Sequence, residues 1–440
     1  MRARFKSGLL WNLLGAVFTQ GGTLAVNVIT ANILGREVFG QYAFVQSTTL
    51  AMSVVAQVAT GYTATKYLAE FRSTQKERAG RVLGLCTLVA AGMALVAALS
   101  LFLGAGSVAV HALHAPPGLT ATLRIAAAAV PFSVMNGLLV GGLAGFEGFR
   151  AIARAGIVSG TLNMLFGALG ARLFGLNGAV VGLAAGYLGQ FIVLSFVLRV
   201  VARDHGVQIR LRGVWKERSI ILRFAIPAAM NGLSTMPAIW LANVWLARQP
   251  NGMSQVALYS AATSFRVMVM FVPLLLNNVG LSILNNQRGL GDSRRYARVF
   301  WVNFVMVISV AVLAAGGVAV LGPLLLRIFG GNFDQGTAVL RILLLATVPE
   351  AVGIAAYQII QSQEKMWLSL VAVALPRDVS FALLAYKLAP RLGAQGVALA
   401  HLTGVSVACL VITGLSWHIG LHLKPRETTP AKREDDHATR

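Results

Sequence analysis

Long apolar segments recur along the whole chain, and they constrain its fold more than any other feature. Twelve of them are long and apolar enough to cross a bilayer as helices. They lie near residues 9–34, 41–64, 82–104, 123–145, 155–174, 178–198, 223–247, 256–284, 299–327, 337–360, 368–388 and 394–418. Membrane barrel strands would be about ten residues long with alternating polarity. The sequence therefore predicts an all-α integral membrane protein with 12 transmembrane helices.

Composition supports this class. Only 12% of the 440 residues are charged, against about 25% in soluble domains. The basic start MRARFKSGLLWNLLG resembles a signal peptide, but its apolar run continues to about Leu34 without a clear cleavage site, so we expect a retained first helix. Cys86 and Cys409 both fall in apolar segments and predict neither a disulfide framework nor a metal site.

The basic residues behind the net charge of +22 are unevenly distributed between the connections of the apolar segments. Basic residues gather before the first segment, in alternate connections (residues 66–81, 150–154, 199–223 and 288–298) and in the tail. The positive-inside rule makes these parts cytoplasmic, with both termini inside. The basic excess thus indicates membrane orientation and attraction to anionic lipids, not nucleic-acid binding.

The chain also repeats itself. Arg81-Val82 recurs as Arg298-Val299 (298 − 81 = 217), and Gly175 matches Gly393 (393 − 175 = 218). The near-constant offset predicts two six-helix halves, both entering from the cytoplasm, with a central cavity between them. We expect an N-terminal bundle over residues 1–205, a C-terminal bundle over 206–423 and a disordered cytoplasmic tail over 424–440.

Arg266 is the most unusual residue in this apolar context. It lies about ten residues into its segment, about 15 Å deep, where a charge persists only beside a partner, a substrate or water. Polar residues on the faces of predicted helices 1, 2, 7 and 8 are candidate substrate-binding residues, although Ser, Thr and Asn also join helices. The candidates are Asn12, Gln20, Asn27, Thr49, Gln57, Asn231, Thr263, Arg266 and Asn277.

Two carboxylates are candidates for coupling to H⁺ or Na⁺. Glu350 follows Pro349 in an apolar segment, and half-burial against a basic partner explains it equally well. Asp378 directly follows Arg377, and the two charges could neutralise each other.

The sequence predicts neither an enzyme nor a bound cofactor. It contains no P-loop, HExxH motif or cysteine cluster. A sugar polymerase or ligase would need paired carboxylates on a large outer loop, and the predicted outer loops are short.

Three short stretches carry a family resemblance. They are LGREVFGQY at residues 34–42, TKYLAE at 65–70 and GFEG at 145–148. With the twelve-segment topology, they resemble polysaccharide exporters, the O-antigen (Wzx-type) flippases of the multidrug/oligosaccharidyl-lipid/polysaccharide (MOP) superfamily. Lipid II flippases of that superfamily carry charges on helix 1, whereas Asn12, Gln20 and Asn27 are neutral here.

The resemblance implies a V-shaped transporter in the bacterial inner membrane. It would move an undecaprenyl-diphosphate-linked oligosaccharide outward by alternating access, among membrane lipids and polysaccharide polymerase machinery. A cationic cavity would take the diphosphate, and Arg266 fits that role. A cation-coupled multidrug antiporter of the same fold is the first alternative, and a membrane polymerase or ligase is the second.

Overall fold

The structure, a computed structural model, describes residues 20–113, 118–221, 226–289, 293–362 and 370–421. Within these ranges the chain is helical and contains no strand, which confirms the predicted all-α class. After a helix over residues 20–34, the α-helices are α2 (Arg36–Gln57), α3 (Thr60–Phe71), α4 (Lys76–Ser107), α5 (Gly118–Ala127), α6 (Ala129–Gly145), α7 (Phe149–Asp204), α8 (Arg218–Ile220), α9 (Ile226–Ala247), α10 (Gly252–Gly289), α11 (Ser293–Arg327), α12 (Thr337–Ser362) and α14 (Leu375–Leu421). Shorter turns are η1 (Val108–Ala112), η2 (Val214–Glu217), η4 (Asp334–Gly336) and η5 (Leu370–Ala374).

Many of these helices could cross a membrane. Among the described residues, seven helices are long and apolar enough, or eight if the bent pair α2 and α3 is one span. The helices α7, of 56 residues, and α14, of 47 residues, each contain an internal break, so each is long enough to cross twice. The multi-pass membrane class is confirmed, while the count of twelve crossings is not.

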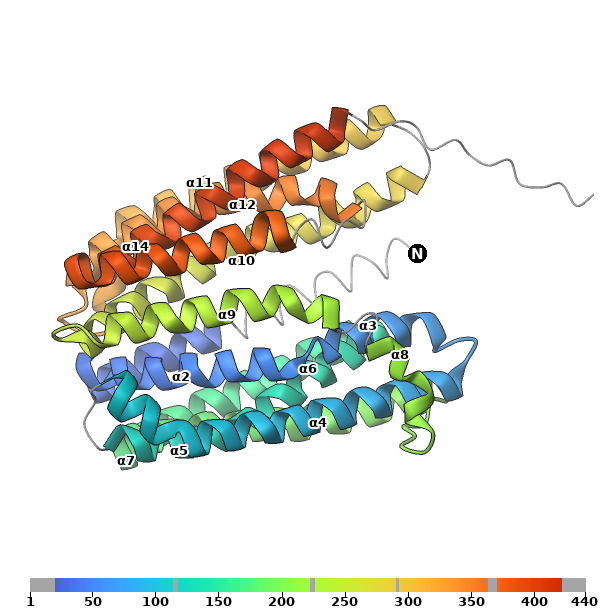
Figure 1. Cartoon of the computed structure of the whole chain (residues 1–440), viewed down its shortest axis with the longest axis horizontal. Coiled ribbons are helices and arrows are strands. Elements are labelled where there is room, and N and C mark those ends of the chain that lie inside the picture. Colours follow the sequence, from blue (N-terminus) through green and yellow to red (C-terminus); the bar gives the residue numbers. More distant parts are fainter. Residues whose placement is uncertain (1–19, 114–117, 222–225, 290–292, 363–369, 422–440) are drawn as a thin grey trace, which may run out of the picture.

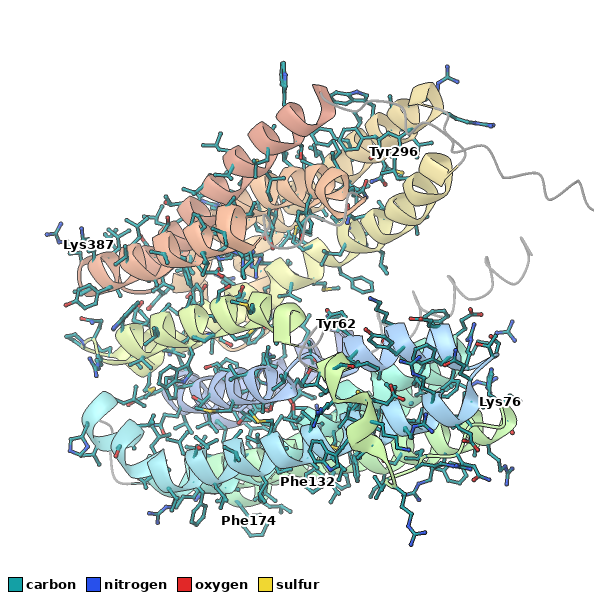
Figure 2. The ribbon with its side chains drawn as sticks, turned by 45° about the vertical axis from the view of Figure 1, so that its right-hand side comes forward. Tyr62, Lys76, Phe132, Phe174, Tyr296 and Lys387 are labelled. Carbon is teal, nitrogen blue, oxygen red and sulfur yellow. The ribbon has the colours of Figure 1, made fainter. Side chains whose placement is uncertain are left out.

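The helices form two groups that meet at one end and diverge toward the other (Figure 1). Helices α2 to α7 make up the first group, α10 to α14 the second, and α9 packs against both α2 and α14. Lys76 lies at the diverging end and Lys387 at the opposite end (Figure 2).

Side chains of the first group hold the second group at the meeting end. Arg36 at the start of α2 donates to the carbonyl oxygens of Ser254 (3.4 Å) and Asn332 (3.2 Å) and to Gln335 Oε1 (2.7 Å). The centroid of the Phe39 ring lies 5.9 Å from the ring centroids of Phe329 and of Phe333. Polar and aromatic contacts therefore close this end.

The two breaks occupy matched positions. Gly175 in α7 has φ 59° and ψ −137°, and Gly393 in α14 has φ 55° and ψ −133°. A glycine tolerates this backbone conformation, whereas a Cβ would be strained. Because the two glycines are 218 residues apart (393 − 175 = 218), the breaks support the predicted repeat. The boundary at residues 205 and 206 stays a prediction, and the predicted tail 424–440 lies outside the described residues.

The segment after α7, residues 206–217, packs onto α4 of the first group. A Cβ added at Gly80 would come 2.0 Å from the Gln208 carbonyl oxygen, and one at Gly84 would come 2.1 Å from that of Arg210. Glu217, 7% exposed, accepts hydrogen bonds from Arg78 (3.0 Å) and Arg81 (3.4 Å). Two glycines and a buried carboxylate thus fix this segment to α4.

Candidate substrate and ion-coupling site

Arg266 on α10 faces Glu350 on α12. Its Nη1 donates to Glu350 Oε2 at 2.7 Å, and the two side chains are 16% and 25% exposed. Of the two explanations that the sequence left open for Glu350, the structure shows the basic partner. The guanidinium is therefore an ion-paired cation and not an isolated positive charge.

Arg266 still has an unused hydrogen-bond donor. Its Nε is buried and has no partner among the described residues. Thr263, one turn earlier on α10, shares a side-chain hydrogen bond with Tyr259. Unsatisfied buried polar atoms are uncommon and costly, because each loses its bonds to water without replacement. The Nε–H group can therefore bind a ligand that supplies an acceptor.

Prolines accompany both members of the pair. Pro349 directly precedes Glu350 inside α12, and Pro273 lies inside α10 two turns beyond Arg266. Each proline removes one backbone donor from its helix and favours a local bend. Both helices that carry the charged pair therefore contain a position where a bend is favoured.

A second charged cluster joins α14 to α9. Asp378, 7% exposed at its side chain, accepts hydrogen bonds from Ser234 Oγ (2.7 Å) and Thr235 Oγ1 (3.0 Å). Arg377 Nε donates to Asp378 Oδ1 at 2.8 Å, and its Nη2 donates to Thr235 Oγ1 at 2.6 Å. The adjacent charges neutralise each other locally, and two hydroxyls complete the shell of the carboxylate.

His401 belongs to the same region and was missed by the sequence analysis. Its Nε2 is buried without a partner among the described residues, and its ring packs edge-on against Phe381 at 5.8 Å. The charges of Arg266 and Arg377 both act on it. The sequence could have singled out His401, because it lies seven residues into the apolar segment 394–418.

The predicted site residue Asn277 lies in a buried amide network. Its backbone oxygen and Oδ1 accept hydrogen bonds from Gln358 Nε2 at 2.8 Å and 2.7 Å. Asn303 Nδ2 donates to Gln358 Oε1 at 3.2 Å. The network joins α10, α11 and α12 about three turns beyond Arg266 on α10. A role of Asn277 in substrate binding stays a prediction.

Of the predicted site residues before α3, two contact the first group and one reaches the second group. Thr49 is fully buried and donates to the Val45 carbonyl oxygen of its own helix at 2.9 Å. Gln57 ends α2, and its side-chain amide fills the space beside Gly137. Asn27 approaches the second group, with Nδ2 3.4 Å from Ser264 Oγ and Oδ1 buried without a partner among the described residues.

For three other predicted site residues, the structure gives little or no information about the side chain. Gln20 is exposed at the start of the described residues. Asn12 lies outside the described residues, and so does the side chain of Asn231, whose backbone is part of α9. Substrate contacts by these residues stay predictions.

Solved structures identify the fold. The chain is similar to an inward-facing multidrug resistance MATE family transporter of the MOP superfamily, with a TM-score of 0.72 and 17% identity over 93% of this chain and 98% of that one. It is also similar to a MOP superfamily transporter from Pyrococcus furiosus, with a TM-score of 0.70 and 18% identity over 93% and 94% of the two chains. The fold is that of MOP superfamily transporters.

The sequence then places the chain within a family. The model of the family described as "Polysaccharide biosynthesis protein" matches residues 5–277, so the chain belongs to that family. It is 25% identical over 207 residues to the EPS I polysaccharide export inner membrane protein EpsE of Ralstonia nicotianae, and 24% identical over 210 residues to that of Ralstonia solanacearum. Each match covers 46% of this chain and 47% of the relative, so the chain spans about half the length of these relatives.

Proposed function

We propose that the protein is a flippase that moves an undecaprenyl-diphosphate-linked oligosaccharide across the bacterial inner membrane for surface polysaccharide biosynthesis. The family and the polysaccharide-export relatives support a role in export. The fold supports transport by alternating access and not catalysis. With the basic connections cytoplasmic and both termini inside, the diverging end faces the cytoplasm.

One observation carries this proposal, namely the membrane-embedded guanidinium of Arg266. Its Nε–H is a buried donor without a partner among the described residues. A guanidinium binds phosphate oxygens through charge-assisted, often bidentate, hydrogen bonds. Hydroxyls and amides on the neighbouring faces would suit sugar hydroxyls, which both donate and accept.

The test is polysaccharide export in a deletion strain that carries variants of this gene. Arg266→Ala removes the cation and should abolish surface polysaccharide at normal protein level, whereas Arg266→Lys should retain part of the export. Arg341→Ala, at an exposed position on α12, is the matched control for loss of one arginine and should export normally. Normal export by the Arg266→Ala variant would refute its role.

A cation-coupled multidrug antiporter is the second candidate. The MATE fold, the half-buried carboxylate of Glu350 and the buried one of Asp378 favour it. Both carboxylates are ion-paired with arginines, however, and a cation would have to displace them. Drug sensitivity of the deletion strain with unchanged polysaccharide would support this alternative over the flippase.

A further inference from the structure

The second group of helices holds two arginine–carboxylate pairs around one histidine. Gly404 allows the parts of α14 before and after its break to approach closely, since a Cβ there would lie 3.0 Å from the Arg377 carbonyl oxygen. His401, one turn before Gly404, packs on Phe381, one turn after Arg377. The charges of Arg266 and Arg377 both reach His401, so the two pairs and the imidazole share one electrostatic environment.

This region carries no net charge when its imidazole is neutral. Two guanidinium groups balance the carboxylates of Glu350 and Asp378. A diphosphate that carries two esters brings about two negative charges into the same place. Excess charge in a low-dielectric interior is costly unless another charge compensates it. Anion binding to this neutral site therefore requires a cation to bind with it or a carboxylate to lose its charge.

The geometry distinguishes the groups that could take up a proton. Asp378 accepts hydrogen bonds from two hydroxyls and from Arg377, so donors already occupy its oxygens. His401 has two arginines acting on it, so a proton there would add a third positive charge beside them. Among the described residues, Glu350 accepts a hydrogen bond from Arg266 alone, and that bond breaks if Arg266 turns to a phosphate.

Among the described residues, Tyr259 and Arg266 on α10 act on Glu350 electrostatically. The Glu350 side chain is 25% exposed, and the next residue, Ala351, belongs to a buried apolar cluster with Met270 and Val307. Once Arg266 turns to a phosphate, these groups offer no positive charge to compensate the carboxylate, and a proton from solvent can do so.

We propose that Glu350 takes up a proton when a diphosphate diester binds Arg266, so that anion and proton bind together. The proposal rests on the anion site proposed above. The Arg266 Nη1–H bond to Glu350 Oε2 breaks, and the guanidinium, still protonated, donates to a phosphate oxygen. A proton from solvent converts the Glu350 carboxylate to the acid. Proton and anion thus favour each other's binding, whereas in an exchange site they would compete.

Calorimetry on the purified full-length protein tests this linkage. The probe is a diphosphate esterified at one end with a short prenyl chain and at the other with one hexose, so that neither phosphate titrates near neutral pH. Titration in two buffers of different ionisation enthalpy gives the number of protons taken up. Where Glu350 is ionised in the free protein and protonated in the complex, the wild type should take up about one proton, and the affinity should fall roughly tenfold per pH unit as pH rises.

Glu350→Gln is the decisive variant, because it removes the proton site and keeps the shape. It should bind the probe with no proton uptake and with an affinity that is independent of pH. Asp378→Asn, the matched carboxylate variant, should retain the uptake of about one proton, and a melting curve for each variant checks that it is folded. Probe binding by the wild type without proton uptake, or loss of the uptake in Asp378→Asn alone, would overturn the inference and leave the anion site standing. Failure of the wild type to bind the probe would overturn the anion site itself.

Discussion

The two groups of helices share a scaffold and differ in charge. Gly175 and Gly393 break α7 and α14 with the same dihedral angles. Close backbone approaches recur at the same offset, since a Cβ at Gly178 would lie 2.0 Å from the Gly170 oxygen and one at Gly396 would lie 2.4 Å from the Leu388 oxygen. Such contacts require glycine in both groups because any side chain would separate the helices.

The charged residues have no counterpart in the first group. Arg266 aligns with Thr49 (266 − 49 = 217), and the next four align at 218. Glu350, Arg377, Asp378 and His401 stand where the first group has Phe132, Ser159, Gly160 and Leu183. The repeat therefore preserves the helix packing, while at these aligned positions the charges around Arg266 are present in the second group only.

The largest effect is expected when the second group is given the residues of the first. The double variant Arg266→Thr/Glu350→Phe removes both charges, so neither is left unpaired. We expect export to fall to the background of the deletion strain while the protein is still made, because the anion contact is lost. Surface polysaccharide and immunoblots of the membrane fraction measure the two quantities. Export at wild-type level would show that the charged pair is dispensable.

The reverse substitution should fail for a different reason. Thr49→Arg places a cation at a fully buried position, and Phe132, which aligns with Glu350, offers it no carboxylate. We expect little folded protein, because an unpaired charge there costs several kcal/mol. Thr49→Val, which also loses the hydroxyl bond to Val45, is the control and should accumulate normally. Abundant, folded Thr49→Arg protein would mean that water reaches this position.

The second charged pair should matter for stability. Asp378→Ala leaves Arg377 without its carboxylate, and breaking a buried pair costs about 3 to 5 kcal/mol, with the lower end expected because Arg377 is 32% exposed. Arg377→Ser/Asp378→Gly, which copies the first group, should melt at a higher temperature than Asp378→Ala alone. Equal melting temperatures in detergent would argue that solvent already screens Arg377.

The two break glycines should respond unequally to alanine. Each substitution strains a backbone with positive φ, at a cost of about 1 to 3 kcal/mol. A Cβ at Gly393 would also meet Gln255 Oε1 at 2.8 Å, whereas Gly175 has open space. Gly393→Ala should therefore lower the melting temperature more than Gly175→Ala. The opposite order would indicate that Gln255 moves aside without loss.

The smallest effect is expected at the end where the groups meet. Arg36→Ala removes three hydrogen bonds from α2 to the second group, in a partly solvated place where each contributes about 1 kcal/mol or less. The closed arrangement of this end should become modestly less populated. Spin labels at Glu37 and Gly331, in a background without Cys86 and Cys409, would report a longer distance in a minor fraction. An unchanged distribution would assign the closure to the Phe39 cluster.

The sequence predicts the fold well because its signals are long-range and redundant. Apolar segments, alternating basic connections and the 217 to 218 offset each indicate a duplicated helical membrane protein. The offset also aligns the two breaks, since it matches Gly175 with Gly393 and both glycines interrupt their helices. The number of crossings is harder to predict, because α7 and α14 continue through their breaks.

The site is only partly predictable. Burial cost singles out Arg266 and Glu350 separately, but their contact spans 84 residues and depends on how α10 and α12 are rotated about their axes. Thr49 shows the converse, because a hydroxyl on a polar face can bond its own helix instead of lining a cavity. His401 carries no sequence pattern of its own. Its importance comes from the two arginines that the fold brings near it.

The docking of residues 206–217 on α4 has a practical consequence for measuring transport. A fluorophore attached at Arg212, an exposed position in that segment, would be fixed to the first group although it lies in the connection between the groups. It would serve as a stationary reference. Energy transfer from it to an acceptor at Trp301, exposed on α11, would then follow the opening of the diverging end in real time.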